Sequence, residues 1–276
     1  MKLYLKTKDY SISQEEFELF YEEDLDMLIT KPTPNNLDKY YESEAYISHT
    51  DSKKSFVDKI YQLVKSHSLK KKVSLLNSFG ASERMVLDIG AGTGDFLLAA
   101  KKQNWKIAGV EPNASARNRA SEKGVVLHSE LNKISNNKFE VITLWHVLEH
   151  LSDLENQIKT IVSLLSENGT LVIAVPNFKS YDANHYGKFW AAFDVPRHLW
   201  HFSKKSIEKL FAKHQMELVK IKPMVFDSFY VSLLSEKYKS GKQNFVRAFI
   251  NGLKSNLKAN STKEYSSHIY ILRKSI

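Results

Sequence analysis

The stretch that decides the fold runs Met85-Val86-Leu87-Asp88-Ile89-Gly90-Ala91-Gly92-Thr93-Gly94-Asp95-Phe96-Leu97. Its apolar start, residues 85–89, is typical of a strand that is buried on both faces of a parallel sheet. Three glycines then indicate a tight turn, and apolar residues from Phe96 to Ala100 follow at helical spacing. A strand, a glycine turn and a helix in this order present free backbone N–H groups to a ligand.

The spacing of the turn separates two classes of ligand. The dinucleotide fingerprint G-x-G-x-x-G needs a glycine where Asp95 stands, and the sequence instead reads D-x-G-x-G-x-G. Asp88 and Asp95 would repel a pyrophosphate but attract the sulfonium and ammonium groups of S-adenosylmethionine. The structural alternative is an ordinary glycine turn that closes a βα unit. We therefore predict that S-adenosyl-L-methionine binds at Asp88, Gly90, Ala91, Gly92 and Gly94.

Four segments resemble the motifs of one enzyme family, the class I S-adenosylmethionine-dependent methyltransferases. Residues 88–94 resemble the first motif and residues 109–113 the second; residues 139–150 and 164–171 resemble the segments around the fourth and fifth strands. The likeness is closest to the branch with the ubiquinone-biosynthesis O-methyltransferases, and it implies an enzyme. It also implies the Rossmann-like methyltransferase fold, an α/β architecture with a doubly wound, mostly parallel seven-stranded sheet.

The order of elements along the chain is consistent with that fold. We expect an N-terminal cap over residues 1–50, a helical lead-in over 51–80 and the cofactor-binding domain over 81–276, with a helical insertion at about 226–262 before the last strand. Further strands are expected at 106–111, 125–128, 139–145, 171–175 and 218–224, with an antiparallel strand at 268–273. Helices are expected at 113–123, at 153–165 with Ser152 as N-cap, and at 203–214.

Composition excludes several classes of protein. The 276 residues are 42% hydrophobic and 26% charged, and no apolar run approaches the roughly 20 residues of a membrane helix. Residues 1–8 lack the apolar core of a signal peptide. With no cysteine, the chain can form neither disulfides nor thiolate metal sites, nor use a cysteine nucleophile. A cytoplasmic enzyme without membrane insertion is the simplest interpretation.

The net charge of +9 raises the question of nucleic acid. Basic residues concentrate at 65–72, but apolar residues at helical spacing within 57–76 predict that these lysines lie on a solvated helix face. A tRNA or rRNA methyltransferase is the alternative that would explain the charge, and a small-molecule acceptor is favoured. A non-catalytic binding protein is the third reading, and the intact glycine turn and Glu111 argue against it.

Glu111 ends the expected second strand, 21 positions after Gly90. A carboxylate there can accept hydrogen bonds from both ribose hydroxyls of an adenosine, so we place Glu111 and the adjacent Pro112 at the cofactor. The alternative is a solvent-facing glutamate at a strand end. The adenine should lie near the end of the third strand, at Ser129, Glu130 and Leu131.

Trp145, His146 and His150 follow the fourth strand at the edge where open α/β sheets bind ligands. We expect Trp145 and His146 to face the methionine half of the cofactor, and His150 to act as a base or to cap the next helix. Structural roles for both histidines are the alternative. No metal is predicted, because an H-x-x-x-H pair needs a further ligand and the sequence offers none at a suitable spacing.

The segment 182–202 is dense in polar and aromatic residues, which suggests that it lines a cavity. Arg197 could clamp an acidic substrate group, and His198 or His201 could take a proton. Alternatively, Asp194 and Arg197 pair and fix the loop. The acceptor pocket is expected between this loop, the His146 region and the N-terminal arm, whose aromatic residues would line the pocket or anchor the arm: Phe17, Phe20, Tyr21, Tyr40, Tyr41 and Tyr46. The expected reaction is in-line methyl transfer to a small-molecule acceptor at oxygen. Nitrogen is the alternative acceptor atom, although the D/N-P-P-Y signature of many amino methyltransferases is absent.

Overall fold

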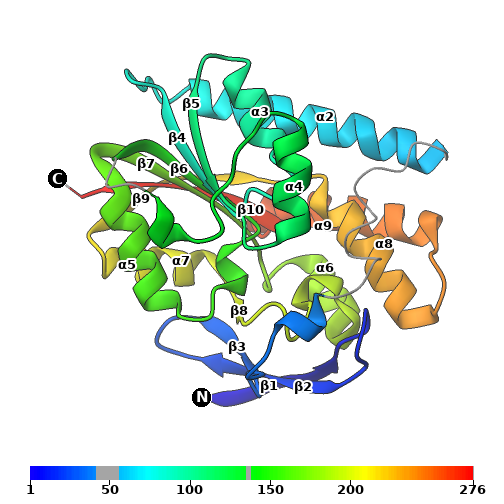
Figure 1. Ribbon diagram of the computed structural model, residues 1–276. Coiled ribbons are helices and arrows are strands. Elements are labelled where there is room, and N and C mark those ends of the chain that lie inside the picture. Colours follow the sequence, from blue (N-terminus) through cyan, green and yellow to red (C-terminus); the bar gives the residue numbers. More distant parts are fainter. Residues whose placement is uncertain (42–55, 135–137, 276) are drawn as a thin grey trace.

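Two sheets share the chain in the computed structural model, which describes residues 1–41, 56–134 and 138–275. The side chains of residues 38 and 56–61 are not described, and Tyr46 lies outside the described residues. Figure 1 shows the larger sheet at the centre, with helices on both sides, and the smaller sheet at the bottom.

The larger sheet has the order β5-β4-β6-β7-β10-β9. Its strands β4, β5, β6 and β7 are parallel, and β10 runs antiparallel to both of its neighbours. The doubly wound, mostly parallel architecture and the antiparallel last strand are therefore confirmed. The strands are β4 (Met85–Ile89), β5 (Lys106–Val110), β6 (Phe139–Trp145), β7 (Leu165–Pro176), β9 (Met216–Pro223) and β10 (Ser267–Lys274).

The expected strand at 125–128 is reduced to a single bridge between Val110 and His128. The N–H of Val125 donates to the carbonyl of Ala120 and so closes the end of the preceding helix. Only His128 then pairs with the sheet edge, through hydrogen bonds to Gly109 and from Glu111. The sheet therefore has six strands rather than the seven that we predicted.

Helices cover both faces of this sheet (Figure 1). Val86 packs with α2 (Phe56–Asn77) and α3 (Asp95–Lys101), whereas Leu87 packs on the other face with α5 (Leu154–Leu164) and α7 (Lys204–Ala212). The N-cap of α5 is Asp153 and not Ser152, because the Asp153 carboxylate accepts the N–H of Asn156. Helix α4 (Ala114–Glu122) follows β5.

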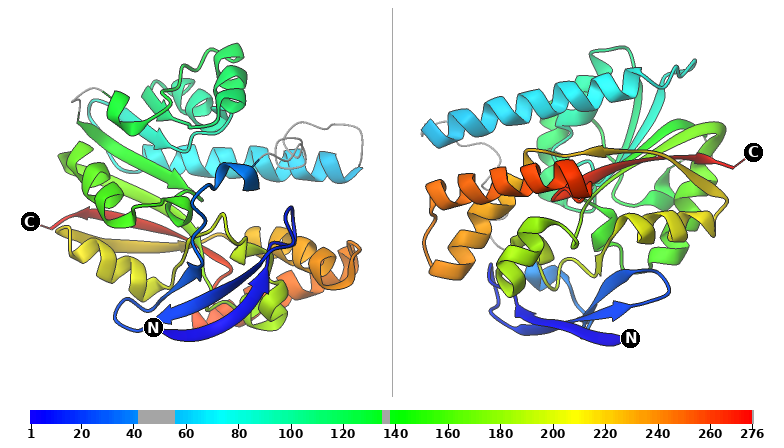
Figure 2. Two further views of the ribbon diagram at one scale, coloured as in Figure 1. Left: turned by 60° about the horizontal axis from the view of Figure 1, so that its bottom comes forward. Right: turned by 180° about the vertical axis from the view of Figure 1, so that it is seen from behind.

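The N-terminal region forms an antiparallel sheet, which the sequence analysis did not anticipate. Strands β1 (Lys2–Lys8), β2 (Glu16–Glu22) and β3 (Met27–Lys31) pair in order, and β3 also pairs with β8 (Trp200–His201). Phe17 and Leu19 alternate inward from β2 and join a core with α6 (Tyr181–Tyr186), η5 (Ala191–Phe193) and α8 (Asp227–Ser240). The short helix η4 (Gly187–Phe189) lies against β1. The smaller sheet thus packs against the segment that was expected to line the active site (Figure 2).

The helical insertion lies between β9 and β10, as predicted. It consists of α8 (Asp227–Ser240) and α9 (Phe245–Thr262), which pack side by side. The remaining elements are η1 (Asp38–Tyr40), η2 (Leu131–Lys133) and η3 (Leu148–His150).

Candidate active site

The glycine turn leaves an open space beside the end of β4. Gly90, Gly92 and Gly94 all have positive φ, at 70°, 54° and 73°, which L side chains rarely adopt. A Cβ at Gly90 would lie 2.3 Å from Cγ2 of Val147, so the segment after β6 packs against the turn. A Cβ at Gly92 would meet nothing within 4 Å. A ligand can therefore approach the backbone at Gly92.

The carboxylate of Glu111 is held against this turn. Its Oε2 accepts the N–H of Gly92 at 2.9 Å, and its Oε1 accepts the N–H of Asn113 at 2.8 Å. Each oxygen keeps a second lone pair that could accept a ribose hydroxyl. The Val110–His128 bridge also brings residues 129–131 beside Glu111, so Ser129, Glu130 and Leu131 lie where the adenine was expected.

A second carboxylate, Asp88, lies buried beneath the turn. Thr143 of the neighbouring strand donates to its Oδ1 at 2.5 Å, and burial raises the pKa of Asp88 to about 7. Lys72 lies close enough to lower that pKa, and its Nζ is 4.2 Å from the ring centroid of Trp145. A cationic ligand group at this place would favour the ionised carboxylate.

Two lysines of α2, Lys65 and Lys72, depart from the solvated face that we predicted, whereas Lys70 and Lys71 are exposed as expected. Burial lowers the pKa of Lys72, against the opposing charges of Asp88 and Asp227. Lys65, two turns earlier on the same face, pairs with Asp95 at 2.7 Å. The apolar pattern alone did not reveal this role, because Lys65 pairs with a carboxylate and Lys72 lies within the field of two others.

His146 links the end of β6 to the helical insertion. Its backbone has a φ of 59°, and its ring lies 3.2 Å from Asp227 through Nε2 and 3.4 Å from Glu149 through Nδ1. Burial alone would lower the pKa of His146, but the two carboxylates raise it to about 10. At neutral pH His146 therefore carries a proton and does not accept one.

A compact group of titratable side chains lies next to His146. It consists of Glu149, His150 and His198. Their ligand atoms lie within 4.8 Å of one another, and the two imidazole rings are 4.5 Å apart. Both oxygens of the buried Glu149 carboxylate lack a hydrogen-bond partner. Burial would raise the pKa of Glu149, but the protonated His146 ring, 3.4 Å away, lowers it by more, so the group is a carboxylate.

The tautomers of the two histidines follow from their backbone partners. Nδ1 of His150 lies 3.0 Å from the carbonyl oxygen of Arg197, and Nδ1 of His198 lies 2.9 Å from that of Ala192. A carbonyl can only accept, so Nδ1 carries the hydrogen in both rings and Nε2 keeps its lone pair. Burial lowers the pKa of His150 to about 4, and it is neutral at pH 7. Tyr41 also contacts Nδ1 of His150, at 2.9 Å.

This group could hold a divalent metal ion, since it offers two imidazole nitrogens and a carboxylate. The sequence analysis expected no such site because no third ligand stood near His146 and His150. The third ligand is His198, 48 positions after His150, and the fold alone brings it there.

The guanidinium of Arg197 is engaged within the protein. It is 1% exposed, pairs with Asp194 at 2.7 Å and Asp9 at 2.9 Å, and donates to the carbonyl of Tyr40 and the hydroxyl of Ser11. Of the two interpretations offered by the sequence, these contacts favour the one in which Asp194 and Arg197 fix the loop.

His201 lies deeper than the other histidines. Its Nε2 is 3.0 Å from Oγ1 of Thr30, whose hydroxyl donates to the carbonyl of His198. Burial lowers the pKa of His201 well below its usual value, so the ring is neutral. From β8, His201 therefore supports the backbone of His198 through Thr30, and its ring lies 6.3 Å from that of His198 between centroids.

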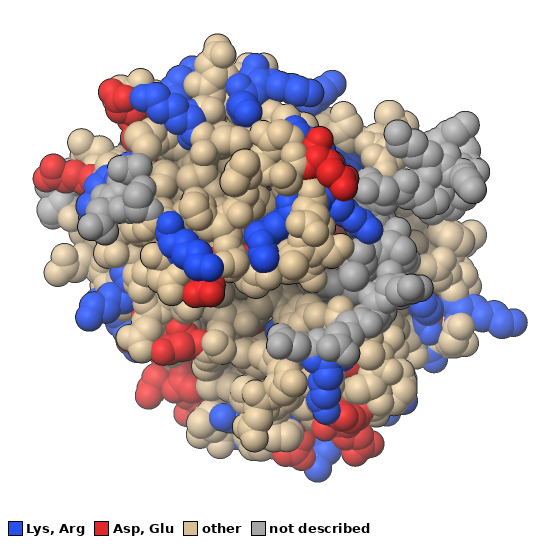
Figure 3. Space-filling model, in the orientation of Figure 1, with Lys and Arg blue, Asp and Glu red and all other residues tan. Residues whose placement is uncertain are grey.

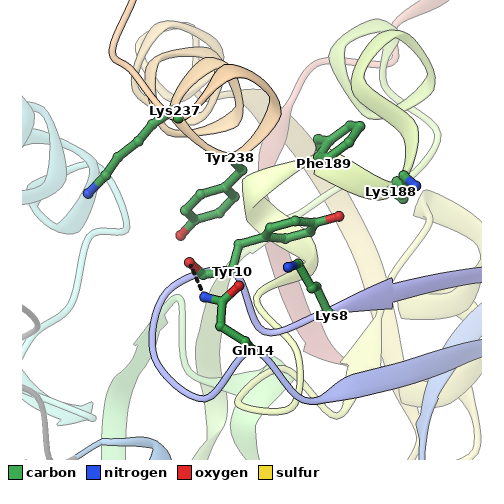
Figure 4. Close-up of a pocket in the computed structure, with 8 residues that line it drawn as sticks. Lys8, Tyr10, Gln14, Lys188, Phe189, Lys237 and Tyr238 are labelled. Atoms are coloured by element: carbon green, nitrogen blue, oxygen red, sulfur yellow. Dashed lines mark hydrogen bonds between the residues drawn. The ribbon is translucent and has the colours of Figure 1, made fainter.

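A cavity of about 520 Å³ lies between the N-terminal sheet, η4 and the end of α8 (Figure 4). Tyr10 stacks on Tyr238 at its centre, with ring centroids 5.3 Å apart. A narrow extension shares these tyrosines and leads to Asp194 and Arg197. The N-terminal arm and the 182–202 loop thus enclose a cavity together, but His146 does not line it. The lining residues are Lys8, Tyr10, Gln14, Lys188, Phe189, Lys237, Tyr238 and Gly241.

The sequence analysis missed four residues of the site: Lys72, Thr143, Glu149 and Asp227. Thr143 was foreseeable, because it lies opposite Asp88 on the adjacent strand. Glu149 stands between the two predicted histidines, and a carboxylate beside His150 was a usable signal. Lys72 and Asp227 come from helices whose packing no local pattern specifies.

Comparison with known proteins places this geometry in a family. A family model for a methyltransferase domain matches residues 54–221. A ubiquinone biosynthesis O-methyltransferase of Histophilus somni (strain 2336) is 31% identical over 118 residues, which are 37% of this chain and 50% of that protein. The chain thus spans half the length of this relative.

Solved structures show the same fold. Magnesium protoporphyrin IX methyltransferase from Synechocystis PCC 6803 with bound SAH has a TM-score of 0.58 at 14% identity, covering 87% of this chain and 99% of that one. A possible histamine N-methyltransferase from Thermotoga maritima has a TM-score of 0.53 at 18% identity, covering 80% of this chain and 97% of that one.

Proposed function

Because this chain belongs to the methyltransferase-domain family and is an S-adenosylmethionine-dependent methyltransferase, we propose that it methylates a small-molecule acceptor at oxygen. The bound cofactor supplies an electrophilic methyl group on a sulfonium. The chain would bind the cofactor at the glycine turn, with Glu111 toward the ribose and Asp88 and Trp145 toward the methionine half. Holding acceptor and methyl group in line can contribute about 7–11 kcal/mol to the rate.

The observation that carries this proposal is the group of Glu149, His150 and His198. An oxygen nucleophile must lose its proton, and a free imidazole nitrogen beside an ionised carboxylate is suited to accept it. We assign His198 as the base, because its Nδ1–H is fixed on Ala192 and its Nε2 keeps a lone pair, 4.0 Å from the Asp194 carboxylate. His150 is the weaker candidate, since burial lowers its pKa to about 4. The Glu149 carboxylate would stabilise the imidazolium that forms.

Other residues would position this base. Arg197 fixes the loop through Asp9 and Asp194, and its carbonyl orients His150. Val147 packs on Gly90, which keeps the segment between β6 and η3 against the glycine turn. His146, which holds its own proton, would present a positive charge at the same edge of the sheet.

Two further observations support a small acceptor methylated at oxygen. The relative that is 31% identical over 118 residues is named as an O-methyltransferase. On the face that Figure 3 shows, Lys and Arg side chains are interspersed with Asp and Glu and do not form a continuous basic stripe, the feature that favours a nucleic acid.

The proposal is tested with matched acceptors. Phenols, catechols and hydroxy acids, each paired with the corresponding amine, are incubated with methyl-labelled S-adenosylmethionine. We expect label in methyl ethers or esters, and a 10²–10⁴-fold lower turnover for His198→Ala with nearly unchanged cofactor affinity, the order expected for loss of a general base. Transfer to the amines alone would overturn oxygen as the acceptor atom. Unchanged turnover in His198→Ala would exclude it as the base.

A further inference from the structure

Helix α9 carries its large apolar side chains on the outside of the molecule. They recur at spacings of three and four residues, which places them in one stripe along the helix. Each is between 42% and 69% exposed. Figure 2 shows α9 from behind, lying on the surface of the protein. The stripe consists of Val246, Phe249, Ile250, Leu253 and Leu257.

The inner face of α9 is made of small and polar residues, and it fixes the helix in this orientation. Ser255 donates to Asp182 at 2.7 Å, and the amide of Asn251 donates to the hydroxyl of Tyr186 at 3.0 Å. A Cβ at Gly252 would lie 2.9 Å from the backbone of Phe229, so α8 and α9 are in close contact. The helix cannot turn its apolar stripe inward without breaking these buried hydrogen bonds.

A basic row follows one flank of the stripe. Arg247, Lys254 and Lys258 are spaced by seven and four residues, so they project from one side of α9. All three are exposed, and none forms a salt bridge within the described residues. Phe226 and Tyr230, at the start of α8, add further exposed aromatic side chains.

We propose that α9 binds the surface of a membrane that contains anionic lipids, with its apolar stripe at the level of the acyl chains and its basic row on the headgroups. An amphipathic helix bordered by Lys and Arg has these properties. A contiguous exposed apolar stripe is also a mark of an interaction site. The contact is peripheral: among the described residues no helix has the length and apolar character of a membrane span.

The positive charge along α9 favours an anionic membrane over a second copy of the chain as its partner. An antiparallel pairing of α9 with α9 about a two-fold axis would bring two basic rows together, on chains that each carry a net charge of +9. An anionic bilayer complements the same row. A nucleic acid would use the basic row but leave the apolar stripe without a partner.

The test is sedimentation of the full chain with vesicles of phosphatidylcholine, with and without phosphatidylglycerol. We expect binding to the anionic vesicles. The double variant Phe249→Ser/Leu253→Ser should reduce the partition coefficient about tenfold or more, because it removes buried CH₂ groups from the interface. Lys254→Glu/Lys258→Glu should reduce binding by a similar factor on anionic vesicles only. Val126→Ser, at an exposed apolar residue away from α9, is the matched control and should bind as wild type.

Circular dichroism melting establishes that each variant is folded. A further variant, Phe249→Trp, places a fluorescent probe in the stripe without removing apolar surface. The fluorescence that this substitution adds to that of wild type should shift to the blue on anionic vesicles. Absence of binding at low salt, binding that both double variants retain, or no such shift in Phe249→Trp would each overturn the proposal. So would a dimer that Phe249→Ser/Leu253→Ser converts to a monomer without any vesicle binding, and so would binding of RNA alone through the basic row.

Discussion

Arg197 shows how a single buried charge can organise the loop that carries the proposed base. Its guanidinium joins Asp9 of the N-terminal sheet to Asp194 of the loop, and its carbonyl contacts His150. His198 follows directly, and Thr30 and His201 hold its carbonyl from the other side. The position of the base therefore depends on residues that need not touch a ligand.

Arg197→Ala should lower the free energy of unfolding by about 3–5 kcal/mol, because it leaves the buried Asp9 carboxylate without its partner. Chemical denaturation measures this. Lys106→Ala removes the exposed pair with Glu83 and should cost less than about 1 kcal/mol. A variant of Arg197 that melts like wild type but has lost turnover would instead identify Arg197 as a substrate-binding residue.

The raised pKa of His146 predicts a pH dependence of stability. Its pKa rises from 6.5 to about 10 on folding, so its contribution is full below pH 6.5 and is lost as the pH rises through 10. We expect the stability difference between wild type and His146→Asn to shrink over this range. Asparagine tolerates the positive φ at this position. Urea denaturation at several pH values checks this, and a difference that is constant with pH would disprove the assignment.

Removal of divalent metal should leave methyl transfer intact, since the sulfonium is electrophilic without a Lewis acid. Initial rates before and after treatment with EDTA test this. The opposite result has a structural basis, because Glu149, His150 and His198 are close enough together to hold a metal ion. If chelation abolished turnover, and a divalent ion restored it in wild type but not in Glu149→Gln, the group would be a metal centre rather than a base.

At the scale of elements, the glycine turn between β4 and α3 is the part that we propose binds the cofactor. Gly92→Val should abolish binding of S-adenosylmethionine, because its side chain would enter the open space beside the turn. Gly124→Val is the matched control: Gly124 also has positive φ and open surroundings, but it lies at the end of α4. Calorimetry and melting curves on both variants separate lost binding from lost stability. Cofactor binding by folded Gly92→Val would show that the turn is not the binding site.

Elements with a strong local pattern were predictable from the sequence. Strand β6 has the expected bounds because its apolar run is nearly continuous. The pair α8 and α9 lies within a few residues of the expected range, although Lys, Ser and Asn interrupt its apolar pattern. Strand β7 begins six residues earlier than expected, at Leu165, because the chain bulges between Leu165 and Thr170 before it resumes pairing with β6. The N-terminal strands alternate clearly at Phe17 and Leu19, but their glutamates and lysines obscured the pattern.

At the scale of the whole molecule, the active site is assembled from segments far apart in the sequence. Lys72, Asp88, Glu149, His198 and Asp227 come from α2, β4, η3, the 182–202 loop and α8. The carboxyl ends of parallel strands are predictable from topology, so the cofactor side could be anticipated. The acceptor side depends on how the smaller sheet and the insertion pack, which no local pattern encodes. The division into three domains stays a prediction.

The most direct test of the central claim is to follow a labelled methyl group from S-adenosylmethionine into an extract of the source cells. After incubation with the protein, small molecules, RNA and protein are separated and counted. The account predicts label in the small-molecule fraction, bound to oxygen, and about 10²–10⁴-fold less of it with His198→Ala. Label that enters RNA or protein, or that appears in small molecules at the same rate with wild type and His198→Ala, would contradict it.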